Sequence, residues 1–212
     1  MKTTKKITIV GCGPGAPKYL TEAGREAILN ASVVAGSPRL LKLYASETQT
    51  RIPVRTDIAG TLEAISAQAE HGKVVVLVSG DPGLSSFARP VLNRFGIDAC
   101  DVLPGISSVQ LAFARLGLDW VDARIISAHK ELPKHRAADF ESSPVVAILA
   151  GHRQARQWIA DLAEAFGPKH SLVVCEDLSM PEERVRPVSL EEFRNLELST
   201  RTVVLLIKKE GA

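Results

Sequence analysis

The sequence predicts an α/β protein with two lobes, and three observations support this prediction. Residues 74–78 form a continuous apolar run, which is typical of a central strand in a parallel sheet that is covered on both faces. Strand-like and helix-like segments alternate along the chain. Residues 116–122 have the composition of a linker, after which the alternation resumes. We therefore expect a first lobe over residues 1–116 and a second over 122–212.

The first lobe is expected to contain five strands separated by helices. Its opening strand is β-branched and runs into a loop with so much glycine and proline that no regular element can continue. The expected strands are 7–10, 32–35, 50–54, 74–78 and 101–103, and the expected helices are 22–30, 39–44, 57–71, 85–95 and 106–115.

The second lobe is expected to repeat the alternation. The expected strands are 124–127, 145–150, 171–175 and 201–208, with a helix at 153–166. Residues 129–144 form a polar stretch with two prolines, and we expect a loop there.

Composition excludes several classes of protein. The 26 Lys and Arg residues nearly balance 24 Asp and Glu residues, so the net charge of +2 gives no general attraction to nucleic acid or anionic lipid. No apolar stretch approaches the length of a membrane span, and the run after the basic amino terminus is too short for a secretion signal. The three cysteines are widely spaced, which indicates neither disulfides nor a zinc site. We expect a cytoplasmic protein with no metal site.

The loop after the first strand formally matches a dinucleotide-binding fingerprint, with Gly11, Gly13 and Ala16 at the required spacing. Two prolines, Pro14 and Pro17, remove amide donors where pyrophosphate would bind. The second strand ends without the Asp or Glu that would bind a ribose hydroxyl. The sequence therefore disfavours NAD or FAD.

Three strands end in comparable turns, at Gly11, at Gly80-Asp81-Pro82 and at Pro104-Gly105. Ligands of open α/β sheets bind outside the carboxyl ends of the strands. A tight strand-to-helix turn is the plain interpretation of any one of these loops. Three of them at one edge favour a bound small molecule.

The turns also carry a family resemblance. Val10-Gly11-x-Gly13-Pro14-Gly15, Leu20-Thr21, Ser79-Gly80-Asp81-Pro82 and Pro104-Gly105-Ile106-Ser107-Ser108 occur in this order. Together they resemble the tetrapyrrole (corrin/porphyrin) methylase family. This resemblance implies S-adenosylmethionine as cofactor and two α/β lobes around a cleft, a fold distinct from the usual Rossmann methyltransferase.

The second lobe resembles one branch of that family, which methylates carbon 5 of a cobalt-precorrin in cobalamin biosynthesis. The residues concerned are Ser127-Ala128-His129 and Glu176-Asp177-Leu178-x-x-Pro181-Glu182-Glu183. Some family members are fused to a methylase that acts at carbon 15 and decarboxylates an acetate arm. This chain stops at Ala212, so we expect only the carbon 5 activity, with a separate C15-methylating decarboxylase as a functional partner. Relatives usually pair, which implies a homodimer.

The resemblance assigns a set of cofactor-binding residues. They are Gly11, Gly13, Pro14, Gly80, Asp81, Pro82, Leu84, Ser85, Ser107, Ser108 and Gly151. Plain helix capping is an alternative for the serines at 85, 86, 107 and 108. Cys12 has no histidine partner in a motif, so packing is favoured over a nucleophilic role.

Asp81 is the candidate catalytic residue. It either binds the methionine ammonium or accepts a proton lost near carbon 5. An Asp before Pro also commonly closes a turn by accepting backbone amides, and that interpretation has equal weight.

The resemblance implies a tetrapyrrole substrate with many carboxylates, and a basic cluster follows the strand at 124–127. His129, Lys130 and Arg136 are the candidate substrate residues, through charge-assisted contacts to acetate and propionate arms. A solvated charged loop is the alternative.

Two other functions stay open. A methylase of the same family acting on uroporphyrinogen, ribosomal RNA or a diphthamide precursor is the first. A nucleotide-binding module without chemistry is the second.

Overall fold

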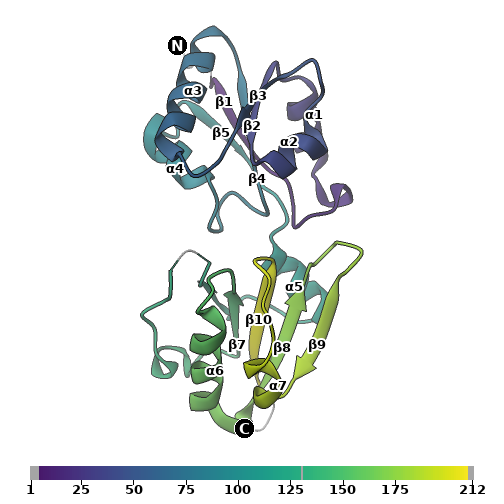
Figure 1. Ribbon diagram of the computed structural model, residues 1–212, viewed down its shortest axis with the longest axis vertical. Helices are drawn as coiled ribbons and strands as arrows, with labels where there is room; N and C mark the ends of the chain where they lie inside the picture. Colours follow the sequence, from purple (N-terminus) through teal and green to yellow (C-terminus); the bar gives the residue numbers. More distant parts are fainter. Residues whose placement is uncertain (1–4, 130, 210–212) are drawn as a thin grey trace. The chain divides into compact units, whose positions relative to one another are not determined.

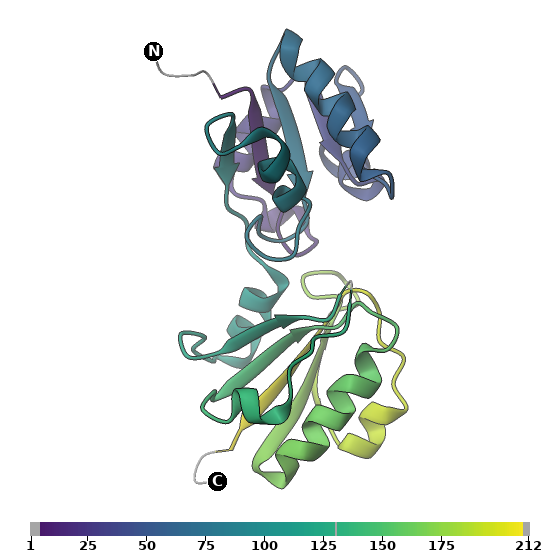
Figure 2. The ribbon, with the colours of Figure 1, turned by 90° about the vertical axis from the view of Figure 1, so that its left-hand side faces the viewer.

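The computed structural model describes residues 5–129 and 131–209, and the chain divides into two compact units between Ser107 and Ser108. Each unit has its own sheet (Figures 1 and 2). Among the described residues, the first unit contains two clusters of buried side chains and the second contains another. The division falls earlier than expected. Helix α5 (Ser108–Leu116) packs against strand β10 (Thr202–Lys208) of the second unit, whereas the sequence placed it in the first lobe.

The reason for this difference is tertiary. α5 buries Val109, Ala112 and Phe113, and local composition does not reveal which sheet will cover them. Of the linker-like residues 116–122, Leu116 ends α5 and residues 117–122 form a loop of the second unit.

The first unit is an entirely parallel sheet with five described strands in the order β3-β2-β4-β1-β5. Its strands are β1 (Ile7–Gly11), β2 (Val33–Gly36), β3 (Thr50–Pro53), β4 (Val74–Val78) and β5 (Cys100–Leu103). Its helices are η1 (Pro17–Tyr19), α1 (Glu22–Leu29), α2 (Pro38–Tyr44), α3 (Ile58–His71) and α4 (Ala88–Phe95).

β4 lies at the centre of this sheet, and its alternate residues belong to two different cores. Val76 shares one core with Ile65 of α3, and Leu77 shares the other with Ile28 of α1. All five residues of β4 are buried, which confirms the expectation that both faces of this strand are covered.

The second unit is a mixed sheet with the strand order β6-β7-β10-β8-β9 among the described residues. Besides β10, its strands are β6 (Arg124–Ser127), β7 (Val145–Leu149), β8 (His170–Glu176) and β9 (Arg184–Val188). Besides α5, its helices are η2 (Ala137–Phe140), α6 (Ala155–Phe166), η3 (Gly167–Lys169) and α7 (Leu190–Arg194).

The predicted alternation of strand and helix is wrong in this unit. β8 and β9 pair as neighbouring antiparallel strands, and β10 is antiparallel to both β7 and β8. β9 and α7 were not predicted at all. β9 is an edge strand that contains Arg184, Arg186 and Pro187, so it lacks the apolar run by which the other strands were recognised.

These strand directions bring several loops to one edge of the second sheet. The carboxyl ends of β6, β7 and β8 and the amino ends of β9 and β10 meet there. α6 and α7 cover one face of the sheet and α5 lies on the other, as Figure 2 shows.

Over residues 5–129 and 131–209, no helix combines the length and the apolar character that crossing a bilayer requires.

Candidate functional site

The turns that follow β1 and β4 are joined by backbone hydrogen bonds. Gly80 N donates to Gly13 O over 2.8 Å, and Gly13 N donates to Gly80 O over 3.2 Å. Cys12 N donates to Val78 O over 2.8 Å. Both Gly13 and Gly80 have positive φ, at 78° and 66°, which L side chains rarely adopt.

The turn that follows β5 packs directly against the other two. A Cβ on Gly105 would lie 2.4 Å from Gly80 O and 2.6 Å from Gly11 O. A Cβ on Gly11 would lie 2.6 Å from Gly105 N and 2.8 Å from Cδ of the buried Pro82. These contacts leave no room for a side chain at Gly11 or Gly105, so the three turns form one rim of packed backbone. We call it the glycine rim.

Asp81 joins two of these turns through its carboxylate. Oδ1 accepts a hydrogen bond from Gly83 N over 2.7 Å, and Oδ2 accepts one from Gly105 N over 3.1 Å. Both oxygens therefore have a backbone donor. These contacts agree with the turn-closing interpretation of Asp81. They also go beyond it, because the second donor, Gly105 N, belongs to a different turn.

The remaining residues of the β4 turn differ in exposure. Leu84 is half-buried, and Ser85 is exposed with a φ of 49°. Ser86 Oγ accepts from Ala88 N and donates to Pro82 O, but the N-cap position of α4 is Phe87, which makes no side-chain cap. α4 begins at Ala88, three residues later than predicted.

Pro14, Ser107 and Ser108 are the other predicted cofactor residues of this region. Pro14 is half-buried in the β1 turn. Ser107 is 6% exposed, and its Cα would be 3.7 Å from a Cβ on Gly80. Ser108 is the first residue of α5 and belongs to the second unit.

Cys12 lies inside the rim but is not suited to nucleophilic chemistry. It is 1% exposed, and burial raises the pKa of its thiol to about 12. Its Sγ donates to Val10 O over 3.6 Å. The packing role expected for Cys12 is confirmed.

In the second unit, Gly151 and His129 lie together. A Cβ on Gly151 would fall 1.7 Å from Nδ1 of His129, so the imidazole rests on the glycine backbone. Ala128 O accepts from His152 N over 2.8 Å, which joins the two loops at the shared sheet edge.

The other predicted substrate residues are not gathered at this point. Lys130 lies outside the described residues. Arg136 is exposed, and its backbone N donates to Asp139 at the start of η2. A hollow of about 700 Å³ beside β6 is lined by Arg124, Lys134 and His135 among others, and of the described candidates neither His129 nor Arg136 lines it.

Arg115 and Arg201 were missed by reasoning from the sequence. They pair with Glu183 and Asp177 of the loop that joins β8 to β9. The partners are 68 and 24 residues apart, so no local signal marks them. Within the described chain, no group of three or more His, Cys, Asp or Glu side chains is placed to hold a metal ion.

The first unit is a covered parallel sheet with a rim of backbone turns at its carboxyl edge, and the second is a mixed sheet, so the chain is a two-unit α/β protein. Residues 6–194 match the profile of the Tetrapyrrole (Corrin/Porphyrin) Methylases, and the chain belongs to this family.

Relatives and solved structures of the family cover nearly the whole chain. The chain is 33% identical to the cobalt-precorrin-7 C(5)-methyltransferase of Salmonella typhimurium, over 94% of this chain and 98% of that one. It is 32% identical to the precorrin-6Y C(5,15)-methyltransferase [decarboxylating] of Mycobacterium tuberculosis, over 85% of this chain and 45% of that one.

Two crystal structures show the same fold. The precorrin-6Y methylase of Archaeoglobus fulgidus has a TM-score of 0.72 and 27% identity, covering 97% of this chain and 99% of its own. The uroporphyrin-III C-methyltransferase of Thermus thermophilus, complexed with S-adenosylhomocysteine, has a TM-score of 0.74 and 25% identity. The match covers 95% of this chain and 96% of that one. The expected family and fold class are confirmed.

Proposed function

We propose that this protein transfers a methyl group from S-adenosylmethionine to carbon 5 of cobalt-precorrin-7 in cobalamin biosynthesis. The observation that carries the proposal is the glycine rim, where three strand ends meet in packed backbone at the carboxyl edge of a parallel sheet. The match over nearly full length to a cobalt-precorrin-7 C(5)-methyltransferase supports the choice of acceptor.

The residues present suit S-adenosylmethionine. Carbonyl oxygens of close-packed turns carry partial negative charge, which suits a sulfonium cation, and glycine lets a ligand approach the backbone closely. Gly11, Gly13 and Gly80 supply such backbone, and the turn that contains Ser85 is strained at that residue, as is common at ligand sites. Pro14, Pro82, Leu84, Ser107, Ser108 and Gly151 complete the proposed cofactor set.

The chemistry needs positioning more than it needs an activating group. The bond between sulfur and the methyl group breaks with its electron pair left on sulfur, and the new carbon–carbon bond takes its pair from the macrocycle. The proton that the macrocycle then gives up passes to a base or to water. Holding donor and acceptor in line is worth roughly 7–11 kcal/mol of the barrier.

Asp81 has a positioning role in this proposal. Its carboxylate holds the β4 and β5 turns together through Gly83 N and Gly105 N. Proton transfer by Asp81 is a second proposal, and Asp81→Asn separates the two.

His129, Lys130 and Arg136 are proposed to bind carboxylate arms of the macrocycle. Neutralising Lys130 and Arg136 together should raise the KM for the tetrapyrrole and leave the affinity for S-adenosylhomocysteine unchanged. Equal loss of both affinities would assign these residues to folding instead.

The cofactor is tested by calorimetry. We expect the protein to bind S-adenosylhomocysteine, which carries the same adenosyl and homocysteine parts as the cofactor. If the protein binds only NAD or ATP, the proposed methylase function is wrong and the protein is a nucleotide-binding module.

The acceptor is tested by incubation with S-adenosylmethionine and one tetrapyrrole at a time. The methylated product is detected by mass spectrometry. We expect cobalt-precorrin-7 to be methylated and uroporphyrinogen III to be left unmethylated. The reverse preference would keep the family and change the acceptor. Comparing the cobalt-containing and metal-free macrocycles would establish which form is used.

We also propose that the protein is a cytoplasmic homodimer that acts beside a separate C15-methylating decarboxylase. The Mycobacterium tuberculosis relative carries both positions in its name, and this chain matches 45% of its length. Light scattering during size-exclusion chromatography would show whether a dimer exists. A monomer at micromolar concentration would contradict it.

A further inference from the structure

The loop that joins β8 to β9, residues 177–183, contains two residues in a conformation that L side chains rarely adopt. Asp177 has a φ of 47° and Ser179 has a φ of 74°. Such strain persists only where the surroundings enforce it, and it is concentrated at functional sites. The loop lies at the edge of the second sheet that also carries Gly151 and His129.

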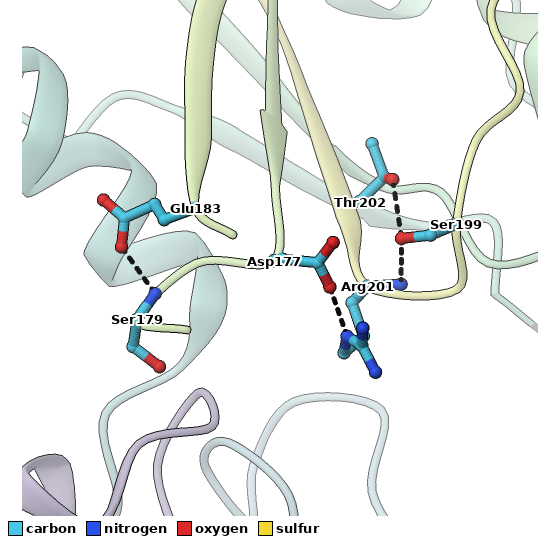
Figure 3. Close-up of polar contacts among 6 residues, drawn as sticks. All are labelled: Asp177, Ser179, Glu183, Ser199, Arg201 and Thr202. Carbon is cyan, nitrogen blue, oxygen red and sulfur yellow. Dashed lines mark hydrogen bonds and ion pairs between the residues drawn. The ribbon is translucent and has the colours of Figure 1, made fainter. Parts of the chain in front are cut away.

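Glu183 enforces the conformation of this loop from its far end. Its Oε2 accepts a hydrogen bond from Ser179 N over 2.6 Å, as Figure 3 shows. The same carboxylate receives the guanidinium of Arg115, with Nη2 3.2 Å from Oε2 and Nε bonded to Oε1. One carboxylate therefore binds a strained backbone amide and a cation from a different element.

Asp177 is held from the other side. Its Oδ1 accepts from Nε of Arg201, in the turn that leads into β10 (Figure 3). That turn is itself closed by Ser199, whose Oγ accepts from Arg201 N over 3.2 Å and lies 3.3 Å from Oγ1 of Thr202.

These contacts join the loop to both second-unit residues of the proposed cofactor set. Arg115 lies on α5, the helix that begins at Ser108. Thr202 O accepts from Ala150 N over 2.9 Å, immediately before Gly151. A shift of the loop would therefore be transmitted to α5 and to the Gly151 turn.

We propose that Glu183 is a positioning residue for S-adenosylmethionine, which it serves by holding α5 and the β8–β9 loop in one fixed arrangement. This inference rests on the proposed function. The negative charge of Glu183 is needed because it pairs with Arg115 in a half-buried position. The Arg115 side chain is 35% exposed and the Glu183 side chain is 21% exposed.

The test is Glu183→Gln, which keeps the size and an acceptor for Ser179 N but removes the charge that Arg115 meets. We expect the Kd for S-adenosylhomocysteine to rise about tenfold, or about 1.4 kcal/mol. The KM for S-adenosylmethionine should rise with it, whereas kcat and the KM for the tetrapyrrole should stay within about twofold. A merely structural role would not separate the two KM values.

Glu182→Gln is the matched control, because it removes the same charge from the adjacent, exposed residue. We expect no change in either affinity. Arg115→Lys is the second variant and keeps the positive charge without the planar fork. It should raise the Kd about threefold, and it keeps the inference testable if Glu183→Gln fails to fold.

Two results are decisive against the inference. Wild-type protein that binds S-adenosylhomocysteine, with Glu183→Gln and Arg115→Lys both within twofold of it, would overturn this role for Glu183 and leave the proposed function intact. Wild-type protein that binds no S-adenosylhomocysteine would overturn the proposed function and this inference with it.

Discussion

The sheet edges that carry the proposed ligand-binding residues are built differently in the two units. In the first unit the glycine rim is backbone packed on backbone, so that Gly11, Gly80 and Gly105 touch directly. In the second unit the edge is held by charged side chains, and the strained positions are occupied by Asp177 and Ser179 rather than by glycine.

This difference predicts how each edge responds to substitution. A packed backbone cannot give way, so an added methyl group should be severe at the glycine rim. Partly exposed ion pairs contribute less to stability, so single substitutions at the second edge should have smaller effects that differ from residue to residue.

The largest effect is expected from Gly105→Ala. Its new Cβ would lie 2.4 Å from Gly80 O, which forces the β4 and β5 turns apart. We expect the free energy of unfolding to fall by about 2–3 kcal/mol. The affinity for S-adenosylhomocysteine should fall by at least about 100-fold, or about 2.7 kcal/mol.

Urea unfolding and calorimetry measure these two quantities. Gly72→Ala is the control, because a Cβ there would meet only Ser32 Oγ, at 4.0 Å. If Gly105→Ala has the stability and the affinity of the wild-type protein, the glycine rim can adapt to a side chain, and the contrast between the units is wrong.

Asp81→Asn is expected to have the next largest effect. An amide supplies one acceptor oxygen for two backbone donors, Gly83 N and Gly105 N, so one of them loses its bond. We expect a loss of about 1–2 kcal/mol in stability and at least a tenfold drop in kcat.

The pH profile of kcat separates the two proposals for Asp81. A positioning role predicts a lower kcat with an unchanged profile, whereas proton transfer predicts that one limb of the profile disappears. Near-normal kinetics with intact binding would exclude proton transfer by this residue.

Buried thiols in the two units, unlike the two edges, should respond alike to pH. Burial raises the pKa of Cys12 in the first unit and of Cys175 in the second to about 12 each. The folded state then keeps both thiol protons between pH 9 and 12, while the unfolded state loses them. Stability is therefore complete below about pH 9 and decreases as pH rises.

From pH 9 to pH 10 the loss should be roughly 1 kcal/mol per thiol. Cys12→Ala and Cys175→Ala should each remove about that much of the pH dependence, as measured by urea unfolding at the two pH values. An unchanged slope in both variants would show that these thiols do not cause it.

The smallest effect is expected from Arg201→Lys. The Arg201 side chain is 55% exposed, and exposed ion pairs contribute at most about 1 kcal/mol. We expect the affinity for S-adenosylhomocysteine to change by less than about threefold, measured by calorimetry. A larger loss than that caused by Glu183→Gln would transfer the main positioning role from Glu183 to Arg201.

The contrast between the units also explains what could be predicted from the sequence. All five strands of the first unit were found, because glycine and proline punctuate their ends and β4 is an unbroken apolar run. The rim residues were recognised for the same reason. That Gly105 touches both other turns was not predictable, since it depends on strand order.

The second unit was harder to predict from the sequence, because the residues that fix its structure are far apart in the chain. β9 has the composition of an exposed edge, and α5 shows its partner sheet only once folded. The pairs Arg115–Glu183 and Asp177–Arg201 join residues whose types are common on any surface. Charge patterns alone do not distinguish such pairs from solvated residues.

Isotope transfer tests the central claim most directly. The protein is incubated with S-adenosylmethionine labelled with ¹³C in its methyl group and with cobalt-precorrin-7, and the product is assigned by NMR. We predict a single labelled methyl group on carbon 5. Label on another carbon, or an unlabelled macrocycle alongside a protein that binds S-adenosylhomocysteine, would contradict it.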